Sequence, residues 1–256
     1  MRITLLQKQG AMKREAFAKT LEQAFVNLKG ELAATLKPIG FSQKGYAQIE
    51  LQGDDSEIVL ELISQKLGLA HTDFSSVELY GNYEGITGRH SAENLEVNLG
   101  IEVPKPMSAK IKVNSLRAQL ADGKPLPLRE VVDHYCLYPE SKVSIRMTEL
   151  ESDGGGTLEA WLADSQIQKY SEWIGSGLDR IQVFNCSQQE VDSAIRRLNL
   201  ERDIISLEPL TLTSQSVLCK LGTDAIGLIP KLGRALRESE LKPFLPKRIY
   251  ARCRPW

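Results

Sequence analysis

The chain has 256 residues, of which 42% are hydrophobic and 25% charged, and its formal net charge is −1. This composition is typical of a folded globular protein and excludes a chain that is disordered throughout. The length exceeds that of a usual single core, so roughly two or three compact units are expected. No apolar run approaches the ~20 residues that cross a bilayer, and Met1–Leu6 lacks a secretory hydrophobic region. We therefore predict a cytoplasmic protein with no membrane partner.

The few cysteines and histidines limit the chemistry of this chain. No cysteine pair has Cys-x-x-Cys spacing, and no histidine has a second ligand at metal-binding spacing; these residues are Cys136, Cys186, Cys219, Cys253, His71, His90 and His134. His90 and Ser91 are adjacent in sequence, which does not give the facing geometry that nucleophilic catalysis needs. The sequence therefore predicts no metal, no cofactor and no catalytic residue, and hence a non-enzymatic protein.

The small net charge hides an uneven distribution. Residues 1–39 hold seven Lys or Arg against three acids, residues 40–100 hold three against ten, and residues 231–256 hold eight against two. The two ends are basic and the middle is acidic. Such asymmetry is typical of a surface that faces a polyanion, although a solvated face without a partner gives the same pattern.

The sequence pattern over residues 1–70 predicts an N-terminal α/β unit of β-α-β-α order. A short strand covers 3–8 and a helix covers 14–36, because Phe17, Leu21, Phe25 and Leu28 recur at helical spacing. An alternating strand follows at 46–51. Asp54-Asp55-Ser56 is then expected to cap a second helix that ends near Gly68, because short polar side chains accept amide protons at helix starts.

Residues 71–121 predict a barrel-like segment of OB type. Strand patterns around 77–80, 95–101 and 109–113 are separated by Gly81, Gly85 and Gly88, and a short helical turn closes at Ser115–Leu120. This stretch resembles the OB-barrel RNA-binding modules of the large bacterial ribosomal protein and of polynucleotide phosphorylase, although it lacks their phenylalanine-glycine turn. The resemblance implies an exposed aromatic and a basic residue on the first strands, at places that Tyr80, Tyr83, Arg89 and His90 fill.

Residues 122–200 predict an α+β unit of β-β-α-β-α order after a first helix at 128–137. Strands at 143–150 and 157–162 form a hairpin around a glycine-rich turn at 152–156, which takes positive φ angles cheaply. A helix at 165–174, a strand at 180–184 and a helix at 188–198 follow.

Residues 201–256 predict a β-rich, basic C-terminal segment. Alternation over Ser214–Leu221 indicates a strand, Gly222–Asp224 a turn, and Ala225–Pro230 a second apolar strand. Lys247–Arg254 is expected as a last strand, and the glycine turn between strands suggests a small barrel. The predicted fold class is therefore α+β, in which OB-type barrel segments are combined with β-α-β-α and β-β-α-β-α units.

Two sequence blocks resemble an archaeal protein family of unknown function. They are Leu120–Arg129 (LADGKPLPLR) and Cys219–Gly233 (CKLGTDAIGLIPKLG). The resemblance implies a cytosolic protein with barrel-like modules, and it supplies no activity or catalytic residues.

The basic segments and the barrel aromatics together predict a non-enzymatic RNA-binding protein of translation or RNA processing, whose partner is RNA or a ribonucleoprotein. Phosphate binding needs clustered positive charge, and exposed aromatic rings stack on unpaired bases. The candidate RNA-binding residues are Tyr80, Tyr83, Arg89, Lys220, Lys231, Arg234, Arg237, Lys247, Arg248, Tyr250, Arg252 and Arg254.

Two alternatives stay open. An accessory factor of a ribosome or transcription complex would use the acidic residues 40–100 against a basic partner within a protein complex. An unrecognised enzyme that acts on nucleotides or RNA is the third hypothesis, against which the lack of a catalytic set speaks. The sequence does not indicate the oligomeric state.

Overall fold

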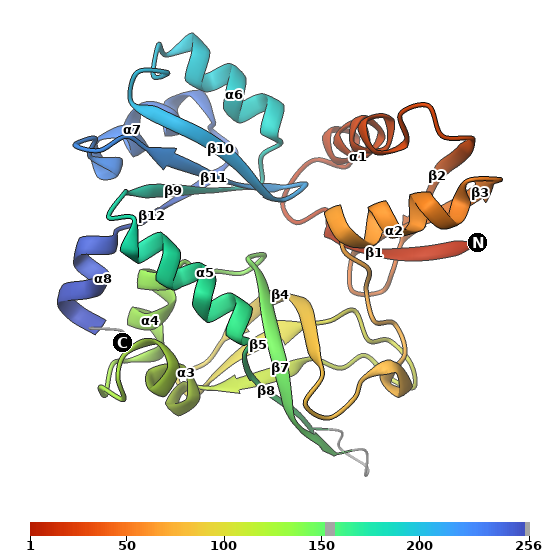
Figure 1. The fold of residues 1–256 in the computed structure, drawn as a ribbon, viewed down its shortest axis with the longest axis horizontal. Helices are drawn as coiled ribbons and strands as arrows, with labels where there is room; N and C mark the ends of the chain where they lie inside the picture. Colours follow the sequence, from red (N-terminus) through yellow and green to blue (C-terminus); the bar gives the residue numbers. More distant parts are fainter. Residues whose placement is uncertain (152–156, 254–256) are drawn as a thin grey trace.

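Three β-sheets organise the chain in a computed structural model that describes residues 1–151 and 157–253 (Figure 1). A three-stranded sheet, a closed five-stranded barrel and a four-stranded sheet follow one another along the sequence. The mixed α+β class and its small barrel are confirmed. The predicted glycine-rich turn at 152–156 and the candidate residue Arg254 lie outside the described residues.

The N-terminal unit packs two helices on a three-stranded antiparallel sheet of order β1-β3-β2. The predicted apolar stripe of the first helix, Phe17, Leu21, Phe25 and Leu28, is buried against this sheet. The elements are β1 (Arg2–Lys8), α1 (Arg14–Lys29), β2 (Ala34–Phe41), β3 (Tyr46–Gly53) and α2 (Ser56–Lys66).

Strand β2 was missed in the sequence, where a helix was expected through Leu36. The helix ends instead at Gly30, whose φ of 52° suits glycine, and the chain turns into β2. Pro38 is tolerated there because β2 is an edge strand with an irregular register between Pro38 and Gly40. The expected side-chain cap of α2 is also absent, because the Asp55 carboxylate accepts the Ala33 N–H at 2.7 Å.

The barrel closes in the order β4-β5-β6-β8-β7, with helices between its third and fourth strands, and this is the arrangement of an OB fold. All strand pairs are antiparallel except β6 with β8. The elements are η1 (Phe74–Ser76), β4 (Asn82–His90), β5 (Asn94–Asn98), β6 (Ala109–Lys112), α3 (Val113–Leu120), α4 (Leu128–Tyr135), β7 (Lys142–Glu151) and β8 (Thr157–Leu162).

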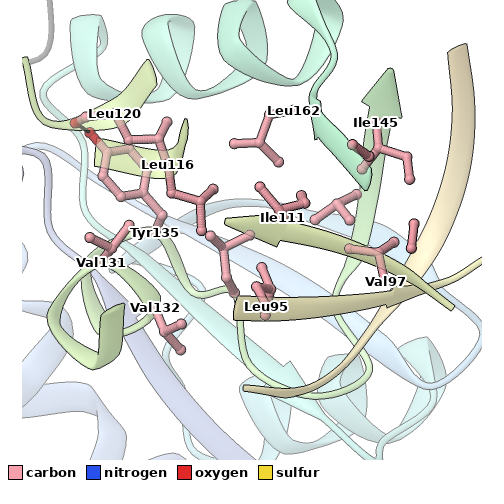
Figure 2. Packing of buried hydrophobic residues seen from close by; sticks show 14 of the residues in the cluster. Leu95, Val97, Ile111, Leu116, Leu120, Val131, Val132, Tyr135, Ile145 and Leu162 are labelled. Atoms are coloured by element: carbon pink, nitrogen blue, oxygen red, sulfur yellow. Dashed lines mark hydrogen bonds between the residues drawn. The ribbon is translucent and has the colours of Figure 1, made fainter. Parts of the chain in front are cut away.

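Alternating residues of these strands fill the barrel. Val97, Ile111 and Ile145 lie inside, and Leu116 and Tyr135 cover one end from α3 and α4 (Figure 2). The buried Tyr135 hydroxyl donates to the Leu120 carbonyl at 2.6 Å, so this polar group has a partner in the core. The core leaves the outward residues of each strand free for contacts with solvent or a ligand.

The C-terminal sheet has the order β10-β11-β9-β12 and is antiparallel. Helices α6 and α7 cover one face with a second core, and α5 lies between the sheet and the barrel (Figure 1). The elements are α5 (Asp164–Gly175), β9 (Arg180–Phe184), α6 (Gln188–Arg197), β10 (Ile204–Thr211), β11 (Ser214–Cys219), α7 (Ala225–Ala235), β12 (Glu240–Phe244) and α8 (Pro246–Cys253).

Two predicted strands of this region are helices, and its predicted barrel is an open sheet. The run from Ala225 begins α7 because the Asp224 carboxylate accepts the N–H groups of Ile226 and Gly227 at 3.0 and 3.1 Å. A short apolar run fits either type of element, and here the cap decides. The segment after Leu245 is α8, which starts with Pro246 at a position where a helix tolerates proline.

Barrel closure joins segments that the sequence assigned to different units. The predicted boundary between residues 121 and 122 falls inside the barrel, because β7 and β8 from the segment 122–200 cover the edges of β4 and β6. The same segment supplies β9 at the centre of the C-terminal sheet. In the part of the chain that the structure describes, no helix has the length and apolar character that a membrane crossing needs.

Polar side chains connect the N-terminal unit to both others. Lys44 donates to Asn98 Oδ1 at 3.3 Å and to Ser108 Oγ at 3.2 Å on the barrel, and burial lowers the pKa of Lys44 to about 8. Gln7 accepts the Leu212 N–H of the β10–β11 turn at 2.8 Å. These bonds fix the β2–β3 turn against the barrel and β1 against the β10–β11 turn.

Candidate nucleic-acid interface

A basic groove lies between α1, α6 and the end of α7. It consists of two adjoining depressions, of about 700 and 730 Å³, that share Arg197, Ala235 and Arg237. Its cations are Lys13, Lys19, Arg197, Lys231, Arg234 and Arg237. All six are exposed. We refer to this feature below as the basic groove.

Helix ends place two of these arginines. Arg197 is the last residue of α6 and donates to the Ala235 carbonyl at 3.4 Å, and Arg234 in the last turn of α7 donates to the Pro230 carbonyl at 3.4 Å. A cation is favoured at a helix C-terminus, where the carbonyl groups lack partners. A guanidinium has five donors, so most of them stay available to a ligand.

The groove carries an excess of positive charge. Six cations face two carboxylates, Glu190 and Glu238, and both carboxylates are occupied. Glu190 accepts from the Ser187 N–H at 2.9 Å and the Ser187 hydroxyl at 2.7 Å in the capping box of α6. Glu238 pairs with Lys13 at 2.6 Å and raises the pKa of Lys13. Helix ends explain two of the cations, but they do not explain an anion-poor groove lined by six.

The fold brings the basic N-terminal and C-terminal segments of the sequence together here. Lys13 and Glu238 form their ion pair across 225 residues, and the Ala11 N–H donates to Asn185 Oδ1 at 3.1 Å. Of the candidate residues, Lys231, Arg234 and Arg237 line the groove. The sequence missed Lys13, Lys19 and Arg197, for which the only available signal was the basic character of residues 1–39 and of the end of α6.

The three barrel candidates are separate from the groove residues. Tyr80 is 61% exposed, and Arg89 is exposed near the end of β4. The Tyr83 ring packs against the barrel core and meets His71 edge-on at 4.8 Å, and its hydroxyl accepts the Glu78 N–H at 2.7 Å. Burial lowers the pKa of His71. Tyr83 thus has a structural role in the fold, whereas Tyr80 and Arg89 are open to solvent.

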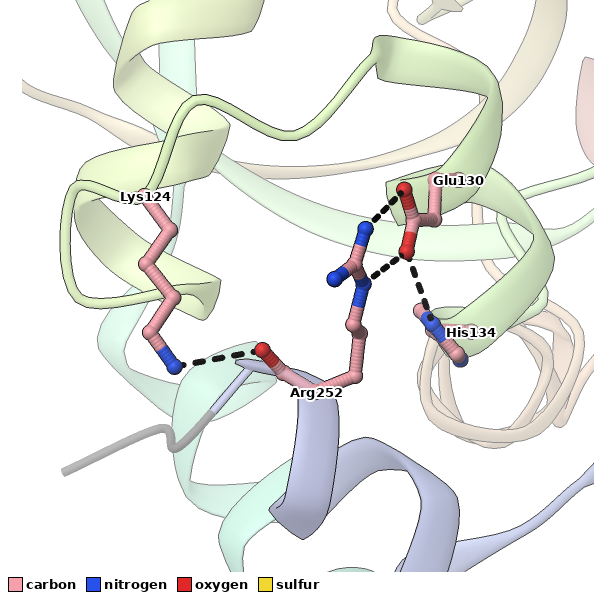
Figure 3. A network of polar contacts seen from close by, with 4 residues as sticks. All are labelled: Lys124, Glu130, His134 and Arg252. Atoms are coloured by element: carbon pink, nitrogen blue, oxygen red, sulfur yellow. Dashed lines mark hydrogen bonds and ion pairs between the residues drawn. The ribbon is translucent and has the colours of Figure 1, made fainter.

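The C-terminal candidates lie on α8, which packs on α4. Arg252 forms a two-pronged ion pair with Glu130, through Nε to Oε1 and through Nη2 to Oε2 at 3.3 Å (Figure 3). His134 Nε2 is 3.7 Å from the same carboxylate, and Lys124 donates to the Arg252 carbonyl at 3.2 Å. The Arg252 hydrogen bond holds the pKa of Glu130 below its usual range. Below, this network is called the α8 clamp.

The other candidates near the C-terminus are exposed. Lys247, Arg248 and Tyr250 lie on the outer face of α8, with Tyr250 64% exposed. Burial raises the pKa of Asp179, and the positive charges of Lys247 and Arg248 partly oppose this rise. Lys220 donates to the Glu201 carbonyl at 3.4 Å.

The described residues contain no group of three or more His, Cys, Asp or Glu side chains that could hold a metal ion. Cys186 borders the basic groove, but it is buried, and burial raises the pKa of its thiol to about 12. A thiol of this kind is protonated at neutral pH and is a poor nucleophile. The chemistry of the groove is therefore that of its cations, which favour an anionic ligand.

The four-stranded sheet with α6 and α7 also corresponds to a known sequence family. Residues 178–242 match the DUF2110 C-terminal domain. The predicted resemblance to a family of unknown function is confirmed for this part of the chain. The DUF2110 match contains the block at 219–233 and four groove cations, Arg197, Lys231, Arg234 and Arg237, whereas the block at 120–129 lies outside it.

Comparison with curated protein sequences gives no match. Among solved structures, a chain of the a/eIF2alpha–aDim2p–rRNA complex from Pyrococcus horikoshii OT3 is similar at 14% sequence identity with a TM-score of 0.27. The similarity covers 48% of this chain and 64% of that chain, so the protein spans less than two thirds of the solved neighbour. A TM-score this low does not establish a shared fold.

Proposed function

We propose that the protein is a non-enzymatic RNA-binding protein of translation or RNA processing, and that its basic groove holds the RNA backbone. The observation that carries this proposal is the charge of the groove: six exposed cations from three segments of the chain face two carboxylates that are already occupied. Phosphate oxygens accept hydrogen bonds from Arg and Lys without regard to base sequence. The proposal places the protein in the cytoplasm.

The groove fits a flexible single strand. One depression joins α1 to the end of α6 and the other joins the end of α6 to α7, so successive phosphates of a strand that follows both can meet successive side chains. Lys13 is neutralised by Glu238, which leaves Lys19, Arg197, Lys231, Arg234 and Arg237 as contacts. Each phosphate contact on a single strand contributes about 0.7 to the slope of log affinity against log salt, so five contacts give about 3.5.

The test is fluorescence-polarisation binding of a labelled single-stranded RNA over a series of salt concentrations. The triple variant Arg197→Glu, Arg234→Glu, Arg237→Glu should weaken binding more than tenfold at low salt and lower the slope by about 2 units. Arg129→Glu makes the same substitution once, at an exposed residue in the first turn of α4 away from the groove, and should leave both quantities unchanged. Unchanged affinity in the triple variant, or no binding at low salt, would contradict the proposal.

Phosphate contacts do not by themselves distinguish RNA from DNA. The same oligomer is therefore measured as single-stranded DNA, and tighter binding to the RNA is expected. Equal affinity would mean a general polyanion site. A basic partner protein that binds the acidic residues 40–100 and stays bound after nuclease treatment would instead support the accessory-factor hypothesis.

A further inference from the structure

One face of the barrel carries exposed aromatic rings that its core does not need. Trp161 on β8 is 51% exposed, and Tyr80 just before β4 is 61% exposed. Between them Arg146 points outward from β7, flanked by the fully buried Ile145 and Met147. Large aromatic side chains contribute most to stability when buried, so their exposure here calls for a function.

The strand register sets these side chains in one row. Arg146 is directly opposite Asn82 of β4 on one side and Trp161 of β8 on the other. The Arg146 guanidinium lies 5.8 Å from the centre of the Tyr80 ring, within the range of a cation–π contact. Tyr80 and Trp161 are thus on opposite sides of Arg146, about two strand spacings or 10 Å apart.

The backbone holds Tyr80 in place. Its N–H donates to the Met147 carbonyl at 3.0 Å, and the Met147 N–H donates to the Gly81 carbonyl at 3.0 Å. Tyr80 has a φ of 64°, a left-handed conformation that is rare for a residue with a Cβ. The hydrogen bonds to β7 fix this conformation, so the ring is presented on a rigid wall and not on a loose loop.

Ion pairs enclose the row on both sides. Toward the start of β7, Lys142 pairs with Glu84 at 2.8 Å, and toward its end Lys112 pairs with Glu159 at 2.7 Å. The hydrogen bond to Glu159 raises the pKa of Lys112, and the negative charge of Glu149 adds to this rise. Within the described residues, no carboxylate is in ion-pair contact with Arg146. The row is therefore a narrow aromatic strip with one free cation, and it lacks the broad apolar centre of a protein interface.

We propose that Tyr80, Arg146 and Trp161 form a stacking platform for unpaired RNA bases, which rests on the RNA-binding function proposed above. The two rings are too far apart to sandwich one base, so each stacks on a different base, and Arg146 binds the phosphate between them. Aromatic stacking accepts any base, because every base has a π-face. The groove supplies phosphate contacts, and the platform adds preference for an unpaired strand.

The test compares two oligomers of equal length and charge, an oligouridylate and its abasic ribose-phosphate counterpart. The wild-type protein should bind the oligouridylate more tightly, because the abasic oligomer offers phosphates but no bases. Tyr80→Ala and Trp161→Ala should each reduce this preference by about fivefold to a hundredfold, with the abasic affinity and the salt slope unchanged. Leu79→Ala is the matched control, because Leu79 is 47% exposed beside Tyr80 and has no ring.

A direct readout comes from Trp161 itself. A base that stacks on the exposed indole should quench its fluorescence on RNA titration, and Trp161→Phe should remove this signal while the far-UV circular dichroism spectrum stays the same. A preference for bases that survives in both alanine variants, or falls equally in the Leu79→Ala variant, would overturn the platform. If only the groove variants lose binding, and lose it to both oligomers, the result bears on the basic groove and not on the platform. The two proposals can therefore fail independently.

Discussion

The basic groove and the α8 clamp contain the same kinds of side chain and use them in different ways. In the groove, Arg197 and Arg237 face an open depression, and the nearby carboxylates are occupied elsewhere. In the clamp, Arg252 is committed to Glu130 by two contacts. Both regions are basic in sequence. The difference shows that charge density along the chain does not separate cations that face an open depression from cations that fix a helix.

The clamp is supported mainly by apolar contacts. Ile249, Cys253 and Phe244 are fully buried in the barrel core, where Phe244 stacks on Tyr170 at 6.3 Å and meets Trp173 edge-on at 5.2 Å. An exposed ion pair adds little stability by itself, because water screens both charges. Arg252 therefore sets the orientation of a helix that the core already holds.

The largest expected effect is on this apolar support. Ile249→Ala should lower the free energy of unfolding by about 2–5 kcal/mol, because it leaves a cavity under α8. The RNA affinity of the folded protein should stay within twofold of the wild type, since the groove lies on α1, α6 and α7. Urea denaturation and polarisation binding measure the two quantities.

Tyr250→Ala is the matched control for stability. Tyr250 is the neighbouring residue on α8 and is 64% exposed, so its truncation should change stability by no more than about 0.5 kcal/mol. If Ile249→Ala instead weakened RNA binding as much as the groove variants do, α8 would belong to the interface and the contrast between the two regions would fail.

A smaller effect separates the two kinds of arginine directly. Arg197→Glu should weaken RNA binding by about tenfold at low salt and lower the salt slope by about 0.7, the value for one phosphate contact, without changing the melting temperature. Arg252→Glu makes the same chemical change but places two carboxylates together, so the melting temperature should fall while the salt slope stays constant. If Arg252→Glu lowered the salt slope and Arg197→Glu lowered only the melting temperature, Arg252 would be the phosphate contact and Arg197 the structural residue.

Local patterns predicted much of the fold. The hairpin of β7 and β8, the strand β9 and the helix α6 lie close to their predicted positions, because their periodicity and flanking turns agree. In α7 the apolar run from Ala225 fits a strand equally well, and the Asp224 cap was needed to decide. The end of α1 was placed too late, because the hydrophobic spacing continues past Gly30 into β2.

The candidate site was predicted only in part, for a different physical reason. Lys231, Arg234 and Arg237 are close in sequence, so their clustering is visible there. Lys13 and Arg197 join them only after folding, through contacts that no local pattern encodes. The row on the barrel shows the same limit: Tyr80 was a candidate, but Arg146 and Trp161 become its neighbours only through the strand register.

The smallest expected effect is the pH dependence of the clamp. Arg252 lowers the pKa of Glu130 in the folded protein from its ordinary value of 4.5, so below that pH the unfolded chain binds more protons than the folded one. The stability that the pair contributes is thus complete above pH 4.5, and it is lost as the pH falls through the folded pKa. Glu130→Gln removes the titrating group, so its urea midpoint should lie below that of the wild type at pH 6 and approach it at lower pH.

Glu57→Gln, at an exposed carboxylate on α2, corrects for the general loss of one negative charge. If the difference between wild type and Glu130→Gln were constant from pH 6 to pH 3, the Glu130 carboxylate would not be held by Arg252 in solution. Arg252 would then be a free cation like those of the basic groove, and α8 would become a second candidate surface for phosphate.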